Sequence, residues 1–156
     1  MLLMPPWPLP PDLAIFCAHP VEEYVEPGQI QFAFRNFAFL GKESIRAAEA
    51  AACAADQNAF WPYHDTLYTN QRGENLNAFS DDRLKQIAAA LNLDTRAFNA
   101  CLDSGEKQAA VDQSSADARA QGINSTPSLF VNGTKVDDWR TWETVKQTID
   151  AELAKK

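Results

Sequence analysis

Positive charge is scarce in this sequence: its 156 residues include 14 Lys and Arg against 21 Asp and Glu, a net charge of −7. Binding to the phosphate backbone of a nucleic acid needs clustered cationic side chains, so we expect no nucleic-acid partner. No stretch approaches the roughly 18 consecutive apolar residues of a membrane-spanning helix, so no membrane span is expected. The first residues lack the basic start of a secretory signal, and we predict no signal peptide within this chain.

Histidine and cysteine are also few. The histidines are His19 and His64, and the three cysteines are Cys17, Cys53 and Cys101. No cysteine pair has zinc-ligand spacing, so we expect neither a metal site nor a cofactor. Because the count is odd, at least one thiol stays unpaired if the other two form a bridge. We interpret His64 as a packed structural histidine and His19 as a loop histidine, because neither is paired with a group that needs a base.

The length is typical of one domain, but its start differs in composition. Residues 1–11 contain five of the nine prolines. Such a segment is typical of polyproline-like or disordered chain. We therefore predict that residues 1–11 stand apart from a single domain covering residues 12–156.

Two stretches near the N-terminus are candidate strands. Leu13–Phe16 is apolar, although four residues do not distinguish a strand from a helix. Gln29–Leu40 begins with apolar residues at every second position, which predicts a strand. Between the two, Pro20 at the start and Pro27-Gly28 at the end predict a short helix over Val21–Val25.

A block of helices is expected next. The stretch after Gly41 is rich in alanine, the best helix former. Ser80 and Asp94 are suitable N-cap residues for two later helices. The helices expected are Lys42–Asp56, Phe60–Tyr68, Ser80–Leu91, Thr95–Leu102 and Ser104–Gly122.

The C-terminal part predicts a hairpin and a last helix. Ser128–Val131 and Thr134–Val136 flank Asn132-Gly133, the usual signal of a type I′ turn. Asp138 is the expected cap of a helix with one apolar stripe, made by Trp142, Val145, Ile149 and Leu153. The order indicates an α/β fold interrupted by helices.

Four segments carry a resemblance to a known family: Phe34–Gly41 (FRNFAFLG), Ala47–Ala50 (AAEA), Phe60–Asp65 (FWPYHD) and Gly122–Gly133 (GINSTPSLFVNG). Together they resemble the DsbA-like thioredoxin family, the thiol-disulfide oxidoreductases of the cell envelope. The resemblance extends over roughly residues 22–153. It implies a thioredoxin-like α/β fold with a helical insertion at about residues 42–122, its N-terminal part incomplete. It also implies extended thiol- or disulfide-containing polypeptide substrates, an unidentified redox partner protein and a periplasmic or other extracytoplasmic location.

The resemblance gives Thr126-Pro127 a substrate-binding role. In the family this X-Pro bond is cis and faces the redox cysteines, and the Thr126 backbone can pair with an extended peptide. An ordinary proline before an edge strand is the alternative. The family's strand order further implies that Leu13–Phe16 lies between Gln29–Phe34 and Ser128–Val131.

The family's catalytic Cys-x-x-Cys motif is missing from this sequence. Cys17 is the only cysteine in the corresponding region. Taken as the second cysteine of the motif it leaves Ala14 in place of the nucleophile, and taken as the first it leaves Pro20 in place of the resolving thiol. Cys17 is therefore the candidate catalytic residue, without a partner. A replaced or mis-started N-terminus and a real divergence both remain open.

Some members of the family have an additional structural disulfide between helices of the insertion, which implies a Cys53–Cys101 bridge with Cα atoms within about 7 Å. Two buried free thiols are the alternative. For function, the first hypothesis is a thiol-disulfide oxidoreductase with impaired redox activity. The second is a redox-silent module that binds peptides. A glutathione-using isomerase or transferase is disfavoured, because the motifs resemble the disulfide-handling branch.

Overall fold

The computed structural model describes residues 2–3, 20–73 and 75–155, which form two compact units. The sheet unit contains the described residues 2–3, 20–35 and 123–155, and the helical unit contains 36–73 and 75–122. The helical unit covers nearly the range predicted for the insertion, 42–122. The limits of the domain and of the segment 1–11 remain predictions. In the described part of the chain, every helix is too short or too polar to cross a membrane.

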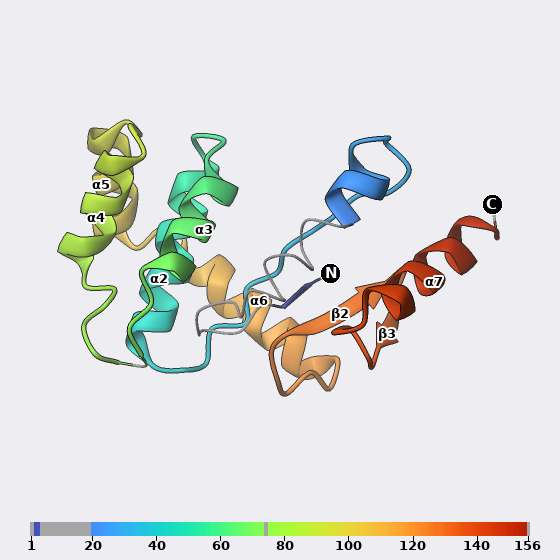
Figure 1. The fold of residues 1–156 in the computed structure, drawn as a ribbon. Helices are drawn as coiled ribbons and strands as arrows, with labels where there is room; N and C mark the ends of the chain where they lie inside the picture. Colours follow the sequence, from blue (N-terminus) through green and yellow to red (C-terminus); the bar gives the residue numbers. More distant parts are fainter. Residues whose placement is uncertain (1, 4–19, 74, 156) are drawn as a thin grey trace. The chain divides into compact units, whose positions relative to one another are not determined.

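The helical unit consists of five helices, with four of them arranged around the fifth, α2 (Figure 1). Small side chains on α2 allow its neighbours to approach closely, since Ala50, Ala51 and Ala54 are at most 4% exposed. Helix α2 contacts each of the other four helices. The five helices are α2 (Lys42–Ala55), α3 (Phe60–Thr69), α4 (Asp81–Ala90), α5 (Thr95–Ser104) and α6 (Gln108–Ala120).

Large apolar side chains from three helices form the core of this unit. Tyr63, Leu84, Phe98 and Leu102 are completely buried. The Tyr63 hydroxyl donates a hydrogen bond of 2.8 Å to the Leu84 carbonyl oxygen, and its ring lies 5.3 Å from that of Phe98. Burial of side chains of this size contributes about 1.5–3 kcal/mol each, so this cluster is a main source of the unit's stability.

The predicted helices agree with the structure except at the boundary between the last two. The Asp94 cap is confirmed, because its Oδ1 accepts hydrogen bonds from the amides of Arg96 and Ala97. The prediction that Ser104 begins the next helix is wrong. Ser104 ends α5 and its hydroxyl donates to the Cys101 carbonyl, after which Gly105 adopts a left-handed φ of 67°. This glycine ends the helix, and α6 begins only at Gln108.

The sheet unit contains three antiparallel strands in the order β1 (Leu2–Leu3), β2 (Ser128–Val131) and β3 (Thr134–Val136). The predicted hairpin is confirmed, with φ of 47° at Asn132 and 86° at Gly133. Helix α7 (Trp142–Leu153) packs on β2 and β3. The predicted apolar stripe is also confirmed: Val145 and Ile149 are buried, while Trp142 and Leu153 are half-buried. The predicted cap at Asp138 is wrong, because turns occupy residues 137–140 and Thr141 precedes the helix.

A short π-helical segment, η1 (Val21–Val25), is attached to α7. Tyr24 is 5% exposed, and its hydroxyl donates to Asp150 Oδ1 at 2.6 Å. Glu23 accepts from the Trp142 indole and pairs with Lys146. The short helix expected after Pro20 is therefore confirmed.

The prediction of a long strand over Gln29–Leu40 is wrong, although its alternating pattern is present. Ile30, Phe32 and Phe34 are half-buried, while the residue directly after each of them is exposed. Among the described residues of this stretch, only Phe34 forms a β-bridge. Alternation creates two faces, but a strand also needs a continuous hydrogen-bonded neighbour. The expected strand at Leu13–Phe16 lies outside the described residues. In the described part, Leu2 and Leu3 flank β2 on the side opposite β3.

Candidate functional site

The turn that leads into β2 contains the predicted substrate-binding residues. Gly122, with φ of 74°, follows the end of α6, and Ile123 is buried. The Thr126-Pro127 peptide bond is cis, and both residues are half-buried. The hydroxyl of the buried Ser128 donates to the Ser125 carbonyl at 2.9 Å, which fixes the turn.

The backbone of Thr126 lies just outside the sheet's ladder. Pairing of β2 with β1 begins at Ser128, and Pro127 has no amide proton. Among the described residues, no other backbone group is hydrogen-bonded to Thr126. This geometry leaves a donor and an acceptor for an added extended chain.

The second half of the predicted site is not placed by the structure. Cys17 and His19 both lie outside the described residues. The role of Cys17 therefore stays a prediction.

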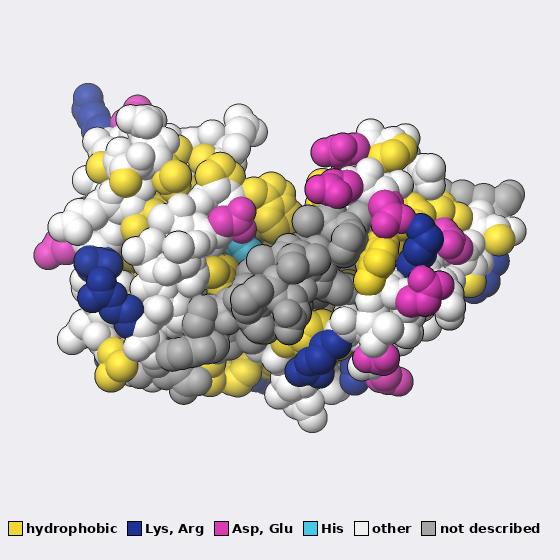
Figure 2. All heavy atoms as spheres, viewed as in Figure 1, with side chains coloured by type: hydrophobic (Ala, Val, Ile, Leu, Met, Phe, Trp, Pro, Cys, Tyr) yellow, Lys and Arg dark blue, Asp and Glu magenta, His cyan; other side chains and the backbone are white. Residues whose placement is uncertain are grey.

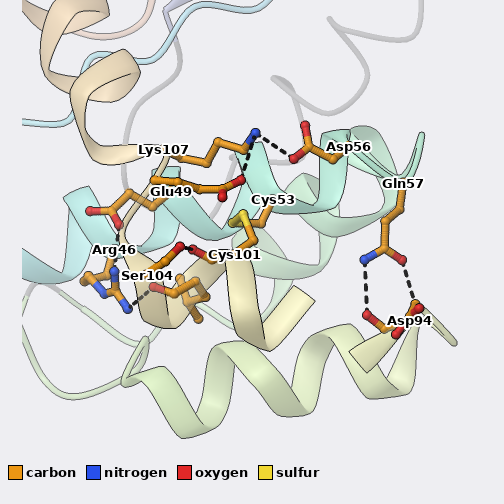
Figure 3. Close-up of a disulfide and its surroundings, with 11 residues drawn as sticks. Arg46, Glu49, Cys53, Asp56, Gln57, Asp94, Cys101, Ser104 and Lys107 are labelled. Carbon is orange, nitrogen blue, oxygen red and sulfur yellow. Dashed lines mark hydrogen bonds and ion pairs between the residues drawn. A yellow bond between two sulfur atoms is a disulfide. The ribbon is translucent and has the colours of Figure 1, made fainter. Parts of the chain in front are cut away.

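The other two cysteines are joined by a disulfide (Figure 3). It connects Cys53 of α2 with Cys101 of α5, with Cα atoms 5.9 Å apart, inside the distance predicted. Cys53 is 1% exposed and Cys101 is half-buried. Two of the three cysteines are thus used within the helical unit, and Cys17 is the third.

Charged side chains lie beside the sulfur of the half-buried Cys101. Carboxylate oxygens of Asp56 and Glu106 and the Cys101 Sγ lie within 4.8 Å of one another. The group is a poor metal site, because Cys101 is bridged and the Lys107 ammonium pairs with Asp56 at 2.6 Å and Glu106 at 3.4 Å. Sequence reasoning missed this cluster, because its members meet only when the end of α2 approaches the start of α6.

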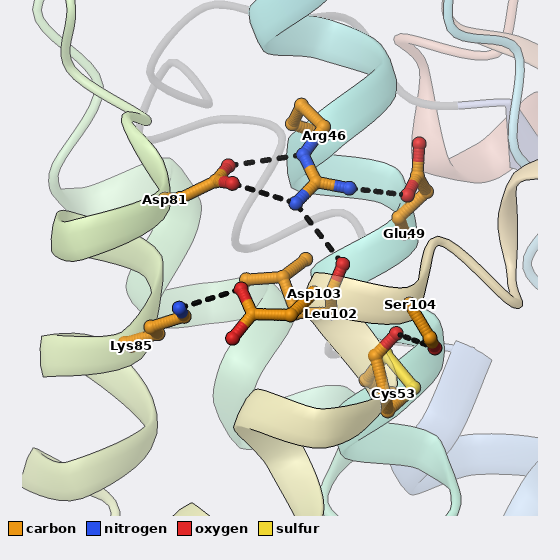
Figure 4. Close-up of polar contacts among 9 residues, drawn as sticks. Arg46, Glu49, Cys53, Asp81, Lys85, Leu102, Asp103 and Ser104 are labelled. Carbon is orange, nitrogen blue, oxygen red and sulfur yellow. Dashed lines mark hydrogen bonds and ion pairs between the residues drawn. A yellow bond between two sulfur atoms is a disulfide. The ribbon is translucent and has the colours of Figure 1, made fainter.

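A second charged group connects three helices (Figure 4). Arg46 of α2 donates two hydrogen bonds to Asp81 at the start of α4, one to the Leu102 carbonyl of α5 and one to Glu49. The bonds to Asp81 raise the pKa of Arg46 and lower that of the Asp81 carboxyl. The i, i+3 spacing of Arg46 and Glu49 was the only signal of this group in the sequence.

His64 has the structural position expected of it. It lies in α3, 4% exposed, with its ring among those of Phe60, Trp61 and Tyr68. Its Nδ1 is 2.9 Å from Asp65 Oδ1. Burial lowers the pKa of His64 below its ordinary value of 6.5, so the ring is neutral at pH 7.

Basic and acidic side chains are both exposed on the face of the protein shown in Figure 2. On the side shown in Figure 2, Lys and Arg side chains lie among Asp and Glu instead of forming one continuous patch.

Comparisons with known proteins agree on the fold. A family model described as Thioredoxin matches residues 17–151. The oxidised crystal structure of BdbD from Bacillus subtilis is similar with a TM-score of 0.83 and 21% identity, covering 98% of this chain and 85% of that one. For the thiol-disulfide exchange protein α-DsbA2 from Wolbachia pipientis, the TM-score is 0.73 at 19% identity, with coverages of 97% and 79%.

A curated relative points to the same group. This chain is 31% identical over 138 residues to the "Probable disulfide bond formation protein D" of Bacillus cereus. The match covers 86% of this chain and 63% of the relative, so the chain spans less than two thirds of that protein's length. The fold is therefore thioredoxin-like, with most of its residues in the helical part. The chain belongs to the DsbA-like thioredoxin family of thiol-disulfide oxidoreductases.

Proposed function

We propose that this protein exchanges thiols and disulfides with extended polypeptides, using Cys17 as the reactive thiol. The observation that carries the proposal is the turn at Thr126-Pro127, with its backbone groups outside the ladder. The family match covers residues 17–151 and therefore includes Cys17.

The substrate docks as an added strand. Its main chain pairs with the N–H and C=O of Thr126, which gives affinity without selecting a particular sequence. The Ser128–Ser125 hydrogen bond holds these backbone groups in position before the substrate arrives. This preorganisation reduces the entropy lost on binding.

The chemistry stops at a mixed disulfide. The Cys17 thiolate attacks one sulfur of a substrate disulfide, a Cys17–substrate bond forms, and the second substrate sulfur leaves as a thiolate. Release then needs a thiol from outside, because the sequence has no Cys-x-x-Cys and Cys53 is bridged to Cys101. Oxidation of dithiols by the chain alone is therefore slow.

The Cys53–Cys101 disulfide supports an extracytoplasmic location for this activity. Structural disulfides persist in oxidising compartments and are rare where thioredoxin and glutathione keep thiols reduced. A disulfide-handling protein acts in the same compartments.

A redox-silent module that holds peptides is the second candidate, favoured by the missing Cys-x-x-Cys. Reduction of insulin by dithiothreitol separates the two. If Cys17 exchanges disulfides, the protein accelerates the reaction and Cys17→Ser abolishes the acceleration. A module that only binds leaves the rate unchanged, and that result would overturn the proposed activity.

The docking step has its own test. Thr126→Pro removes the amide donor and is expected to raise KM for a disulfide peptide, whereas Thr126→Val keeps the amide and the side-chain shape as a matched control. Equal KM values for the two variants would exclude strand pairing at Thr126.

A further inference from the structure

We infer that the carboxylates of Asp56 and Glu106 partly protect the Cys53–Cys101 disulfide from anionic thiols, so that anionic thiols reduce it more slowly than neutral thiols and neutral thiols more slowly than cationic ones. The inference concerns cysteines outside the proposed exchange site and does not depend on that site. It follows from which sulfur is accessible and which charges lie beside it.

Attack is restricted to one of the two sulfurs. Cys53 is 1% exposed in the core of the helical unit, whereas Cys101 is half-buried. A small thiolate can therefore approach only Cys101. A bond forms between its sulfur and Cys101 Sγ, the bond between the two cysteines breaks, and Cys53 leaves as a thiolate that takes a proton from solvent. A second thiol then attacks the mixed disulfide, so that two thiols are oxidised to one disulfide and both cysteines are reduced.

The charges beside Cys101 act on this approach. The carboxylate oxygens of Asp56 and Glu106 lie within 4.8 Å of its sulfur, and Lys107 pairs with both carboxylates. Two negative groups and one positive group leave a net charge of −1 at the attacked sulfur. In water, a unit charge at about 5 Å changes the rate of approach of another unit charge roughly four-fold. An anionic thiol, which carries a carboxylate besides its thiolate, experiences this repulsion twice.

The burial of Cys53 adds to this protection. An apolar surrounding disfavours the thiolate that Cys53 becomes when it leaves, and a poor leaving group slows exchange with every thiol. Burial therefore sets a low rate for all thiols, and the carboxylates select among them. A protein that handles disulfides in this way keeps its own bridge out of the exchange.

The test compares three thiols of similar size: mercaptopropionate (anionic), mercaptoethanol (neutral) and cysteamine (cationic). The full chain carries Cys17→Ser, thiolate concentrations are matched, and reduced Cys53 and Cys101 are alkylated and quantified by mass spectrometry. We expect the rates to rise from the anionic to the cationic thiol. Asp56→Asn and Glu106→Gln should each raise the rate with mercaptoethanol, whose thiolate carries one negative charge, roughly four-fold, and the rate with mercaptopropionate by more, with little change for cysteamine.

Two controls make the outcome decisive. Asp117→Asn removes a carboxylate roughly 13 Å along α6 from Gln108 and should leave all three rates unchanged. When Asp56 and Glu106 are both present, high salt should make the three rates nearly equal because it screens the charges. This control needs no substitution near the disulfide. Equal rates for the three thiols at low salt, or no response to Asp56→Asn and Glu106→Gln, would overturn the inference.

Discussion

Removing the Arg46 side chain should destabilise the helical unit more than any exposed ion pair could explain. Its guanidinium makes four hydrogen bonds that connect α2, α4 and α5. The decisive one goes to Glu49, 2.6 Å from Arg46 Nη1 and only 2% exposed. Arg46→Ala leaves this buried carboxylate without its cation.

The magnitude follows from the burial of the two acidic partners. Breaking a fully buried ion pair by removing one partner costs about 3–5 kcal/mol, and because the Arg46 side chain is 26% exposed we expect a cost at the lower end of this range. The Asp81 side chain is 48% exposed, so losing its pair with Arg46 adds no more than about 1 kcal/mol to the cost. Most of the loss should therefore disappear in the double variant Arg46→Ala/Glu49→Gln, in which the buried group is neutral.

Urea unfolding of the single and double variants measures this directly. Arg46→Lys should lie between the native chain and Arg46→Ala, because lysine keeps the charge but not the paired bonds to Asp81. Lys85→Ala is the matched control: its cation is as exposed as Arg46, but its partner Asp103 is 55% exposed, so the loss should cost at most about 1 kcal/mol. If Arg46→Ala cost no more than this control, or if Glu49→Gln rescued nothing, the reasoning would be wrong.

Three further changes test other parts of the fold. Replacing Cys53 and Cys101 by alanine opens a loop with a sequence separation of 48 and should cost about 4 kcal/mol in urea unfolding. Gly41→Ala should cost about 1–3 kcal/mol, because φ is 95° and the new Cβ would lie 2.5 Å from Asn75 Oδ1. Protonation of His64 favours the unfolded chain, since its pKa is lowered in the fold, so stability should fall as pH drops below 6.5 and His64→Gln should flatten that dependence.

Each of these three predictions has a control, or a result that would contradict it. A reducing agent should destabilise the native chain but leave the double alanine variant unchanged. Gly105→Ala has a left-handed φ of 67° but no atom within 4 Å of the new Cβ, so it should cost less than Gly41→Ala, and an equal cost would remove the steric argument. If the pH dependence survived His64→Gln, another group would be its source.

Local signals in the sequence predicted most elements of the fold. The alanines of α2, the Asp94 cap and the Asn132-Gly133 turn act within a few residues, so each determines its structure without distant partners. The strand predicted over Gln29–Leu40 was wrong because a strand needs a distant partner. The alternating pattern predicts which side chains are half-buried, but pairing in a ladder depends on another segment. The predicted cap at Asp138 was wrong because residues that cap helices also occur in turns, and the one at Ser104 was wrong because its hydroxyl bonds back to the Cys101 carbonyl at the end of α5.

The site could be predicted only in part. Thr126-Pro127 and the Cys53–Cys101 pairing came from the resemblance to the family, and the structure has the cis bond and the disulfide. The carboxylates beside Cys101 and the contacts of Arg46 with α4 and α5 join helices that are far apart in sequence. No local pattern encodes such contacts.

Trapping of the mixed disulfide tests the central claim most directly. The protein is incubated with a peptide disulfide, quenched with acid and analysed by mass spectrometry without reduction. Our account predicts one peptide per chain, attached at Cys17, which persists until an external thiol is added. Absence of the adduct would contradict the role of Cys17, and repeated turnover without an added thiol would show that the redox centre lies elsewhere.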